Sequence, residues 1–545
     1  MSFPSDYVPR TSVQSTYHKS SHEDKYVAEP FPTAVRALKD GAASHEHTRT
    51  LVICLDGTGD QFDNDNSNVV HFVSCLRKHD PSKQVTYYQS GIGTYDAGGL
   101  RNGMAAAIDM AVGSGLGIHI KDAYKFLMQN YRDGDKICLF GFSRGAYTVR
   151  CLAGMLHKVG LLPASNGAQV NFAYSFFKDD TVEGWKMSAQ FKKTFCTNVN
   201  VHFVGVWDCV ASVGFIPRKL PFSKSPTNSI HFFRHAMALD EHRAKFKLCQ
   251  WQQQNPAVQR KDTIDNTPRG KLEREVRKYG IFSSIRKNKA TEGVVSDGLA
   301  KRSNTAEIDH YDMEAEFEKL DGTRKAHQRA ITDAKECYFM GAHADVGGGA
   351  VPNETRHMLS RIPLRWMIRQ CFECDTGILF STSALAEQGL DLSTLWPDYK
   401  PTERPRTGPS STLLEKYEQG AIPPITRRST ALGLDDSTQH DRANIGSLDL
   451  LPEQMEDYLD SMAGINDQLV QAKGWWILEL WPVKVRVQLK DQDGWEKKVR
   501  MNLGRYRAVR EMSPNLHWTV QDRVEKDQYK LRCRHNSNAK WNVIA

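Results

Sequence analysis

The sequence lacks any uninterrupted apolar run of the roughly 18–20 residues that a membrane-spanning helix requires. Its first residues, Met1-Ser-Phe-Pro-Ser-Asp6, also lack the basic and then apolar pattern of a secretory signal peptide. No internal repeat occurs. We therefore expect a cytoplasmic protein with no transmembrane segment, whose contact with membranes is at most peripheral.

The eleven cysteines give no sign of a disulfide framework. Their number is odd, and most of them, Cys54 and Cys138 for example, lie inside apolar runs. Such positions are typical of reduced, buried thiols in an intracellular protein. The C-x-x-C pair Cys371-Phe-Glu-Cys374 has no second pair of ligands with which to bind zinc, so core packing accounts for it better. The sequence predicts no metal site and no organic cofactor.

Neither sign of charge dominates the chain. Lys and Arg number 72 and Asp and Glu 64 among 545 residues, which leaves a net charge of +8. An excess this small does not indicate a nucleic-acid-binding domain, although it favours contact with an anionic membrane surface. With 40% hydrophobic and 25% charged residues, the composition is that of an ordinary globular protein with ample material for a core.

From residue 49 onward, apolar segments of β type alternate with helical segments. Because the predicted strands are apolar throughout and helices separate them, they predict an α/β fold whose mostly parallel sheet is covered by helices on both faces. The predicted strands are Thr50–Leu55, Gln84–Tyr88, Lys136–Phe140, Val199–Val206 and Glu336–Met340. The predicted helices are Asn68–Lys78, Ala105–Tyr131, Ala146–Val159 and Ser229–Phe246.

Composition divides the chain into three parts. Residues 1–48 are rich in Ser, His, Pro and charge without periodicity, so we expect a disordered polar arm. Residues 49–390 form the α/β domain, which a basic insertion interrupts at 252–304. Residues 391–545 form a C-terminal extension.

The extension begins with a Pro- and Ser-rich loop and continues into a predicted helix at Glu453–Lys473. A tryptophan-rich β-hairpin follows, because alternating residues from Val483 to about Asn502 flank a turn at Asp491–Gly494.

A G-x-S-x-G motif, Gly141-Phe-Ser-Arg-Gly145, lies between a predicted buried strand and a predicted helix. In that context the motif is typical of a nucleophile elbow, a strained turn that holds a serine hydroxyl clear of the sheet. The two glycines let strand and helix approach each other closely. Ser143 is therefore the candidate nucleophile.

A nucleophilic serine needs a base and a carboxylate that orients the base. On this kind of fold they follow in the order Ser, acid, His, each just after a strand. Asp208 follows the strand that ends at Val206, and His343 follows the strand that ends at Met340. Their order and positions predict a triad of Ser143, Asp208 and His343.

An acyl-transfer site also needs donors for the oxyanion. One donor is expected from the backbone N–H of Arg144, the residue after the nucleophile. The other is expected from the glycine-rich loop Leu55-Asp-Gly-Thr-Gly59, near Gly57 or Thr58, with Asp56 bracing the loop.

Two alternative interpretations of this region are weaker. Asp-Gly-Thr after a strand suggests a phosphatase of the haloacid-dehalogenase type, but Cys54 occupies the position of the aspartate that would accept phosphate. The acidic run Asp63–Asn68 suggests calcium, but it lacks the Gly and Glu of a calcium loop.

Six motifs in order resemble one α/β-hydrolase family, the uncharacterised hydrolase domains related to type VI secretion phospholipase effectors, which has many fungal members. The resemblance covers about residues 49–370. The motifs are Leu55-Asp-Gly-Thr-Gly, Gln89-Ser-Gly-Ile-Gly-Thr, Gly141-Phe-Ser-Arg-Gly-Ala-Tyr-Thr-Val-Arg150, Val206-Trp-Asp-Cys-Val-Ala-Ser-Val-Gly214, Arg234-His-Ala-Met-Ala-Leu-Asp-Glu-His-Arg243 and Gly341-Ala-His-Ala-Asp-Val-Gly-Gly-Gly349.

The resemblance implies that Ser143 is the nucleophile and that Asp208 and His343 complete the triad, with Cys209 in place of the family's usual threonine. It also implies activity on phospholipid acyl esters, although fold and triad transfer between relatives better than substrate does.

Three further residues compete for a place in the site. His235 lies in a motif shared with the family and is expected to start a packed helix. His517, in the tail, is an alternative base if the tail folds over the site. Asp345 lies only two residues from His343, which suits a role in stabilising the loop better than orienting the imidazole.

The sequence therefore predicts a serine hydrolase that cleaves carboxylic esters through an acyl-enzyme, with lipid acyl esters as the expected substrates. A soluble carboxylesterase or thioesterase acting on small acyl substrates is the alternative. A scaffold protein that kept the fold and lost catalysis fits less well, because the complete Ser, Asp and His set is retained.

Overall fold

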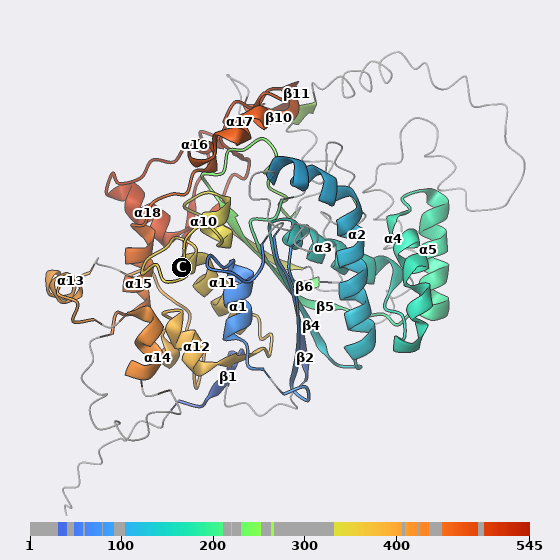
Figure 1. Ribbon diagram of the computed structural model, residues 1–545, viewed down its shortest axis with the longest axis horizontal. Helices are drawn as coiled ribbons and strands as arrows, with labels where there is room; N and C mark the ends of the chain where they lie inside the picture. Colours follow the sequence, from blue (N-terminus) through green and yellow to red (C-terminus); the bar gives the residue numbers. More distant parts are fainter. Residues whose placement is uncertain are drawn as a thin grey trace, which may run out of the picture.

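The structure of the protein is a computed structural model (Figure 1). It describes residues 31–40, 48–57, 60–78, 80–91, 104–210, 220, 230–251, 263–265, 332–405, 409–422, 424–432, 434, 450–488 and 495–545. Most of the predicted polar arm, most of the basic insertion and the hairpin turn at 491–494 therefore lie outside the described residues.

An eight-stranded, wholly parallel sheet forms the centre of the fold and confirms the predicted α/β class. In their spatial order the strands are β15 (Asn542–Ile544), β13 (Asn515–His517), β8 (Asp333–Phe339), β6 (Ile230–Ala238), β5 (Val201–Trp207), β4 (Lys136–Phe142), β2 (Thr50–Leu55) and β3 (Gln84–Gln89).

Each central strand sends side chains into two separate cores. In β2, Leu51, Ile53 and Leu55 enter one core, whereas Val52 and Cys54 enter the other. A strand buried on both faces has no polar face, which accounts for the continuous apolar runs in the sequence.

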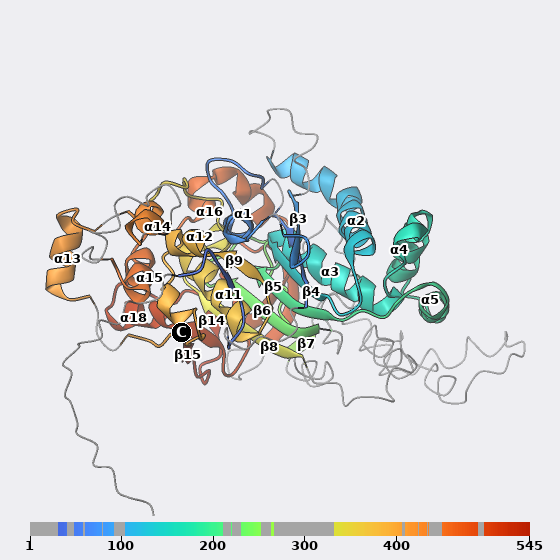
Figure 2. The same ribbon diagram turned by 90° about the horizontal axis from the view of Figure 1, so that it is seen from below.

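Helices cover both faces of the sheet, on opposite sides in Figures 1 and 2. The first face packs against α2 (Met104–Asn130), α3 (Ser143–Val159), α4 (Val170–Lys178) and α5 (Val182–Phe195). The second packs against α1 (Asn68–Cys75), α11 (Arg361–Glu373) and α12 (Thr382–Glu387). A small two-stranded sheet, β1 (Ala34–Arg36) with β9 (Leu379–Ser381), lies beside this second layer.

The predicted helix at Ser229–Phe246 is wrong. Residues Ile230–Ala238 form β6, which pairs in parallel with β5 on one side and β8 on the other. Ala and Met in this segment favour a helix locally, but pairing with a strand on each side outweighs that preference. The polar side chains of β6 are satisfied there: Arg234 pairs with Asp333 at 2.9 Å, and His235 bonds to Glu336 at 2.8 Å.

The C-terminal residues contain short helices, a hairpin and the last two strands of the main sheet. The helices are α13 (Ser411–Glu418), α14 (Arg428–Ala431), α15 (Glu453–Ser461), α16 (Gln468–Gln471), α17 (Trp476–Glu479) and α18 (Trp518–Glu525). The single helix expected at Glu453–Lys473 is thus divided into α15 and α16.

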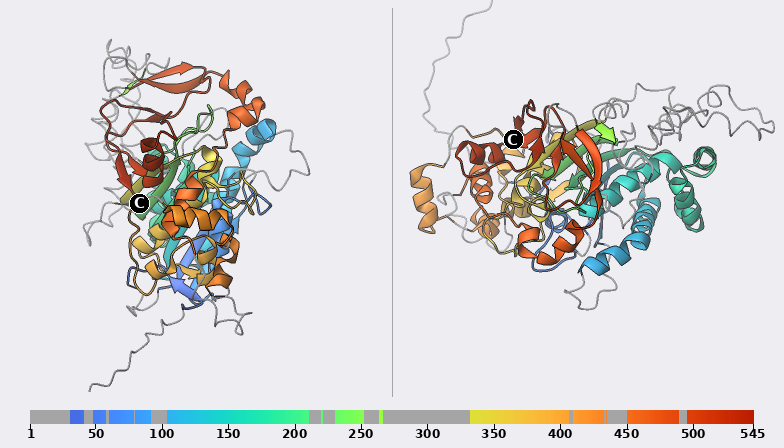
Figure 3. Two further views of the ribbon diagram at one scale, coloured as in Figure 1. Left: turned by 90° about the vertical axis from the view of Figure 1, so that its left-hand side faces the viewer. Right: turned by 90° about the horizontal axis from the view of Figure 1, so that it is seen from above.

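The predicted hairpin is formed by β10 (Val483–Gln488) and β11 (Trp495–Arg500), which pair antiparallel. Strand β7 (Thr263–Asp265), from within the predicted insertion, extends it in parallel. A further short pair joins β12 (Ala508–Val509) to β14 (Arg534–His535). Figure 3 shows that the orange and red C-terminal elements pass over one end of the sheet and reach its edge.

Candidate active site

Ser143 is the first residue of α3 and directly follows β4. Its backbone has a φ of 57°, the left-handed conformation that side chains other than glycine rarely adopt. Gly145 makes this sharp turn possible, because a Cβ there would lie 2.2 Å from the carbonyl oxygen of Leu55. A Cβ on Gly141 would lie 2.7 Å from the backbone nitrogen of Ala146. The turn therefore has the geometry of a nucleophile elbow.

His343 and Asp208 follow the carboxyl ends of two strands at the same edge of the sheet as Ser143. His343 begins α10 (His343–Gly347), just after β8, and Asp208 directly follows β5. The Nε2 atom of His343 lies 2.8 Å from Ser143 Oγ, and its Nδ1 atom lies 2.5 Å from Asp208 Oδ2. All three residues are buried. The structure thus brings together the three residues that the sequence suggested.

Two aromatic rings hold the imidazole of His343. Phe142 lies with its ring centroid 4.6 Å away, and Phe246 packs edge-on at 4.8 Å. Burial lowers the pKa of His343 below its ordinary value, and the hydrogen bond to Asp208 offsets only part of that effect. The ring is therefore neutral at pH 7 and able to accept a proton.

Asp208 pairs with a cation in addition to its hydrogen bond with the His343 imidazole. Arg507, from the C-terminal residues, places Nη1 2.6 Å from Oδ1 and Nη2 2.8 Å from Oδ2. Burial by itself raises the pKa of Asp208, but Arg507 and His343 outweigh it and hold that pKa well below its ordinary value. Asp208 is thus ionised throughout the neutral range. Sequence reasoning missed Arg507, since no local motif marks it.

The loop after β2 lies directly against the elbow. A Cβ on Gly145 would also lie 2.3 Å from the carbonyl oxygen of Asp56. The Asp56 carboxylate accepts hydrogen bonds from the Gly57 N–H at 2.8 Å, from Ser67 Oγ at 2.9 Å and from Tyr88 Oη at 3.0 Å. Asp56 therefore holds Gly57 in place.

The backbone at Gly57 and Arg144 is where the oxyanion donors were predicted. A Cβ on Gly57 would lie 2.0 Å from Asp60 Oδ2, so a side chain at that position would displace the Asp60 carboxylate. Arg144 lies in the first turn of α3, next to Ser143. Thr58, the other predicted donor, lies outside the described residues.

The carboxylate of Asp345 bonds to groups other than the imidazole. Its Oδ2 accepts the N–H of Ala342 at 2.8 Å and that of Asn466 at 2.9 Å, while Oδ1 accepts Asn466 Nδ2 at 2.6 Å. Burial raises the pKa of Asp345 to about 6. Asp345 thus connects the turn that carries His343 to the C-terminal residues.

The other two candidate histidines lie elsewhere. His235, which was expected to start a helix, is in β6; its Nδ1 bonds to Glu336, and its Nε2 accepts the Cys209 N–H at 3.0 Å. His517 ends β13, bonds to Thr519 Oγ1 at 2.9 Å and stacks on Phe339. Burial lowers the pKa of His517 to about 3. His343, and neither of these two, is the histidine that contacts Ser143.

An ion pair lies beside His343. Glu241 Oε2 accepts the His343 N–H at 3.3 Å and lies 2.7 Å from Arg243 Nη2. Burial by itself raises the pKa of Glu241, but Arg243 lowers it to about 2. The Arg243 guanidinium also lies over the rings of Phe246, at 3.5 Å, and Trp475, at 4.8 Å.

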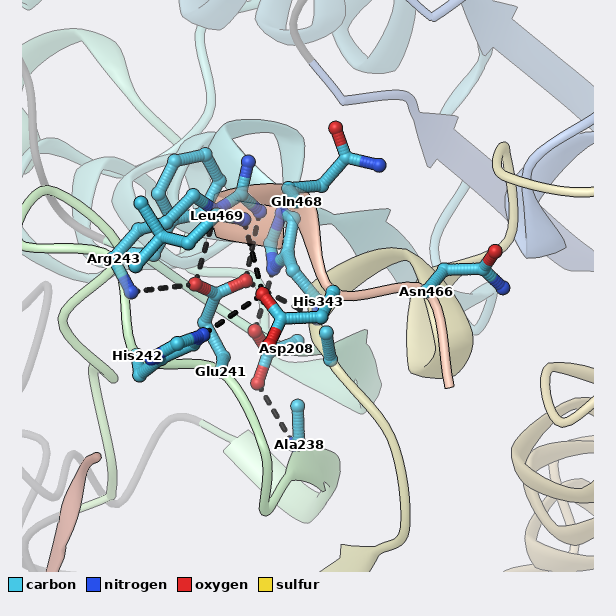
Figure 4. Close-up of polar contacts among 12 residues, drawn as sticks. Asp208, Ala238, Glu241, His242, Arg243, His343, Asn466, Gln468 and Leu469 are labelled. Carbon is cyan, nitrogen blue, oxygen red and sulfur yellow. Dashed lines mark hydrogen bonds and ion pairs between the residues drawn. The ribbon is translucent and has the colours of Figure 1, made fainter. Parts of the chain in front are cut away.

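Residues 466–488 and 495–507 are here called the tail segment, and Figure 4 shows three of them, Asn466, Gln468 and Leu469, in the same close-up as Asp208 and His343. Asp467 Oδ1 bonds to His242 Nε2 at 2.8 Å, and the carbonyl of Gly504 bonds to Nδ1 of the same ring at 2.9 Å. Tyr506 stacks on that ring with 5° between the planes. The C-terminal residues are therefore connected to the triad by hydrogen bonds, ion pairs and ring contacts.

No group of three or more His, Cys, Asp or Glu side chains in the described ranges is arranged to hold a metal ion. Cys371 and Cys374 are buried in the core, where burial raises the pKa of both thiols. Among the helices of the part of the chain that the structure describes, none is both long and apolar enough to cross a membrane.

Comparisons with known proteins show what the chain is similar to. The chain is 28% identical over 560 residues to the uncharacterized protein YEL023C of Saccharomyces cerevisiae, covering 89% of this chain and 80% of the yeast protein.

Two solved structures are also similar. The crystal structure of an uncharacterized protein from Pseudomonas aeruginosa matches 81% of this chain with a TM-score of 0.33 and 14% identity, and this chain spans 61% of that protein. The Tle1 effector bound to the VgrG spike of the type 6 secretion system matches 66% of this chain and 82% of its own, with a TM-score of 0.28 and 16% identity.

Residues 49–370, more than half of the chain, match the family described as "T6SS, Phospholipase effector Tle1-like, catalytic domain". The chain therefore belongs to the family of Tle1-like phospholipase effector catalytic domains.

Proposed function

We propose that this protein is a serine hydrolase that cleaves carboxylic esters of lipids. One observation carries the proposal: His343 lies within hydrogen-bond distance of both Ser143 Oγ, at 2.8 Å, and Asp208 Oδ2, at 2.5 Å. This is the arrangement in which an imidazole removes a serine proton and a carboxylate stabilises the imidazolium that forms.

The reaction proceeds in two steps. Ser143 Oγ attacks the ester carbonyl carbon while His343 Nε2 takes its proton, and the carbonyl oxygen becomes an oxyanion. The backbone N–H of Arg144 stabilises that charge together with a second donor at Thr58, since the Gly57 N–H already donates to the Asp56 carboxylate. The imidazolium then protonates the departing alcohol, which leaves an acyl group on Ser143. Water, activated by the same imidazole, releases the fatty acid and restores the serine.

Lipid substrates are favoured over small esters by two observations. The family's own description names phospholipase effectors, and the chain belongs to that family. The tail segment, which contacts the site, also exposes apolar side chains, as described below. A soluble carboxylesterase or thioesterase is the alternative, which a substrate series will distinguish.

A fluorophosphonate probe tests the nucleophile. We expect the wild type and Ser188→Ala to be labelled and Ser143→Ala to remain unlabelled. Ser188 is a matched control because it is a buried serine whose hydroxyl bonds only to carbonyls in the α4–α5 region. Labelling of Ser143→Ala, or none of folded wild type, would contradict the proposed mechanism.

Turnover of esters and phospholipids of increasing chain length tests the substrate class. We expect the rate per enzyme to rise when the substrate forms vesicles or micelles. Turnover of short, monomeric esters alone would instead identify the soluble esterase.

We further propose that the tail segment docks the enzyme on an anionic lipid surface. Of the fifteen large hydrophobic side chains exposed in the described part of the chain, eight lie within residues 470–503. These eight, here called the apolar patch, are Val470, Trp476, Ile477, Leu480, Trp481, Val499, Met501 and Leu503.

The apolar patch lies in a region that also contacts the site through Trp475 and that carries an excess of positive charge. Trp475 contacts Phe246, whose ring packs on His343. Residues 473–545 hold sixteen Lys and Arg and eight Asp and Glu, an excess of eight that equals the net charge of the whole chain. Exposed apolar groups with surrounding cations are what an anionic bilayer attracts.

The double variant Ile477→Asp/Trp481→Asp should weaken binding to phosphatidylglycerol-containing vesicles by about tenfold or more, because it replaces apolar contacts with repulsive charge. Phe172→Asp is the control, since Phe172 is 63% exposed on α4, on the first face of the sheet. Co-sedimentation measures the bound fraction, and circular dichroism checks the fold. Equal binding of the patch variant and wild type would refute the docking surface.

A further inference from the structure

The cation that pairs with the triad acid comes from outside the part of the chain that matches the family. Arg507 lies between the tail residue Tyr506 and strand β12, whereas the family match ends at residue 370. It is 299 residues from Asp208 along the chain. The family's catalytic region therefore does not supply this contact.

Every N–H group of the Arg507 guanidinium donates a hydrogen bond. Nε donates to the carbonyl of Phe246 at 3.0 Å, as does Nη2 at 2.7 Å, and Nη1 donates to the carbonyl of Ala238 at 3.2 Å. The remaining Nη1 and Nη2 protons go to the two oxygens of Asp208. All five N–H groups thus have acceptors, and the planar fork has one orientation available.

The Asp208 carboxylate is fixed by this fork. Oδ1 accepts Arg507 Nη1 and the Ala238 N–H at 2.9 Å, while Oδ2 accepts Arg507 Nη2 and faces His343 Nδ1. Because a bidentate pair determines the plane of a carboxylate, Arg507 determines the direction from which Oδ2 meets the imidazole. The backbone of Asp208 has a φ of 36°, a left-handed conformation that is unfavourable for an aspartate unless surrounding contacts hold it.

We propose that Arg507 is a positioning residue of the active site, which orients Asp208 toward His343 and sets the pH at which the Asp208–His343 pair takes up a proton. The proposal rests on the proposed function of Ser143 and His343. It makes the C-terminal residues a required part of the catalytic machinery.

The positive charge of Arg507 makes the Asp208–His343 pair take up a proton less readily. With Arg507 present, a proton added to the pair enters a site that already holds a neighbouring cation. Without it, the negative charge of Asp208 is uncompensated and the added proton is bound more readily, whichever of the two residues carries it. The rate falls at low pH as the pair takes up a proton, and this fall is here called the acid limb of the pH–rate profile. Loss of Arg507 should therefore move the acid limb to higher pH.

The rate of fluorophosphonate labelling from pH 5 to pH 9 tests this proposal without a lipid substrate. For Arg507→Met we expect the acid limb to rise by about one pH unit or more, the size typical of losing an adjacent charge. The plateau rate should fall at least tenfold, because the carboxylate loses its orientation. Arg507→Lys retains the charge but not the fork, so it should keep the wild-type limb and still lose plateau rate.

Arg523→Met is the matched control. Arg523 is also an arginine of the C-terminal residues, but its guanidinium bonds to the carbonyls of Ser461 and Gln528 and to Met340 Sδ, not to the triad. It should retain the wild-type pH profile. Rates are compared per folded molecule, since a structural role would change the folded fraction and leave the limb where it is.

The outcomes separate the two proposals. A wild-type limb and plateau in Arg507→Met would overturn the role of Arg507 while the labelled serine stands. If Arg507→Met does not fold, Arg507→Lys decides: a wild-type plateau rate overturns the proposal, and a lowered plateau with an unchanged limb supports it. Absence of labelling in the wild type would instead refute the nucleophile, and Arg507 with it.

Discussion

Ser143→Ala and His343→Ala are each expected to lower kcat for ester hydrolysis by about four to six powers of ten, because the triad acts as a unit. Without Oγ no acyl-enzyme forms, and without the imidazole the hydroxyl keeps its proton. His343→Ala leaves Asp208 paired with Arg507, so the carboxylate is not orphaned. The loss of activity should therefore occur in a protein that remains folded.

Initial rates with a chromogenic ester and thermal melting together check this prediction. Ser188→Ala serves again as the control and should keep wild-type kcat. Residual activity above about one per cent in both variants would mean that another group performs the attack.

Asp208→Ala is expected to cost stability as well as activity. Removing the carboxylate leaves the Arg507 guanidinium, whose side chain is 10% exposed, with the carbonyls of Ala238 and Phe246 as its acceptors. Breaking a buried ion pair by deleting one partner typically costs about 3–5 kcal/mol. We expect a loss of that size in the free energy of unfolding, measured in urea at pH 7.

The pH of that measurement matters because the pKa of Asp208 is lowered in the folded state. A carboxylate of this kind contributes its stability above its unfolded pKa of about 3.9, and the contribution is lost as the pH falls below that value. The double variant Asp208→Ala/Arg507→Met should recover part of the loss, since no buried charge then remains unpaired. No recovery would show that the cost arises from the altered turn after β5.

Much of the fold was predictable because the strands are buried on both faces. The predicted ranges Thr50–Leu55 and Lys136–Phe140 match β2 and most of β4, since a continuous apolar run between two helical segments is typical of a strand in a covered parallel sheet. Strand β6 was mistaken for a helix because its pairing partners outweigh local preference. Strands β13 and β15 have three residues each, too few to show any periodicity.

The residues of the candidate site that could be predicted are those that directly follow a strand of the main sheet. Ser143 has a local motif, and Asp208 and His343 follow strands in an order that this kind of fold imposes. Arg507 is one of sixteen cations in the last 73 residues, and nothing near it in the sequence distinguishes it. Its role depends on β13 pairing with β8, which brings the C-terminal residues to the strand ends.

The separation of Arg507 from Asp208 has a consequence during protein synthesis. A ribosome that adds about 5–20 residues per second needs roughly 15–60 s to proceed from one to the other. Throughout that interval the nascent polypeptide already holds Asp208, but no arginine fork is there to orient it. By the effect expected for Arg507→Met, Ser143 would then react at least tenfold more slowly in the nascent chain than in the finished protein, and the same would hold for any product cut short before Arg507.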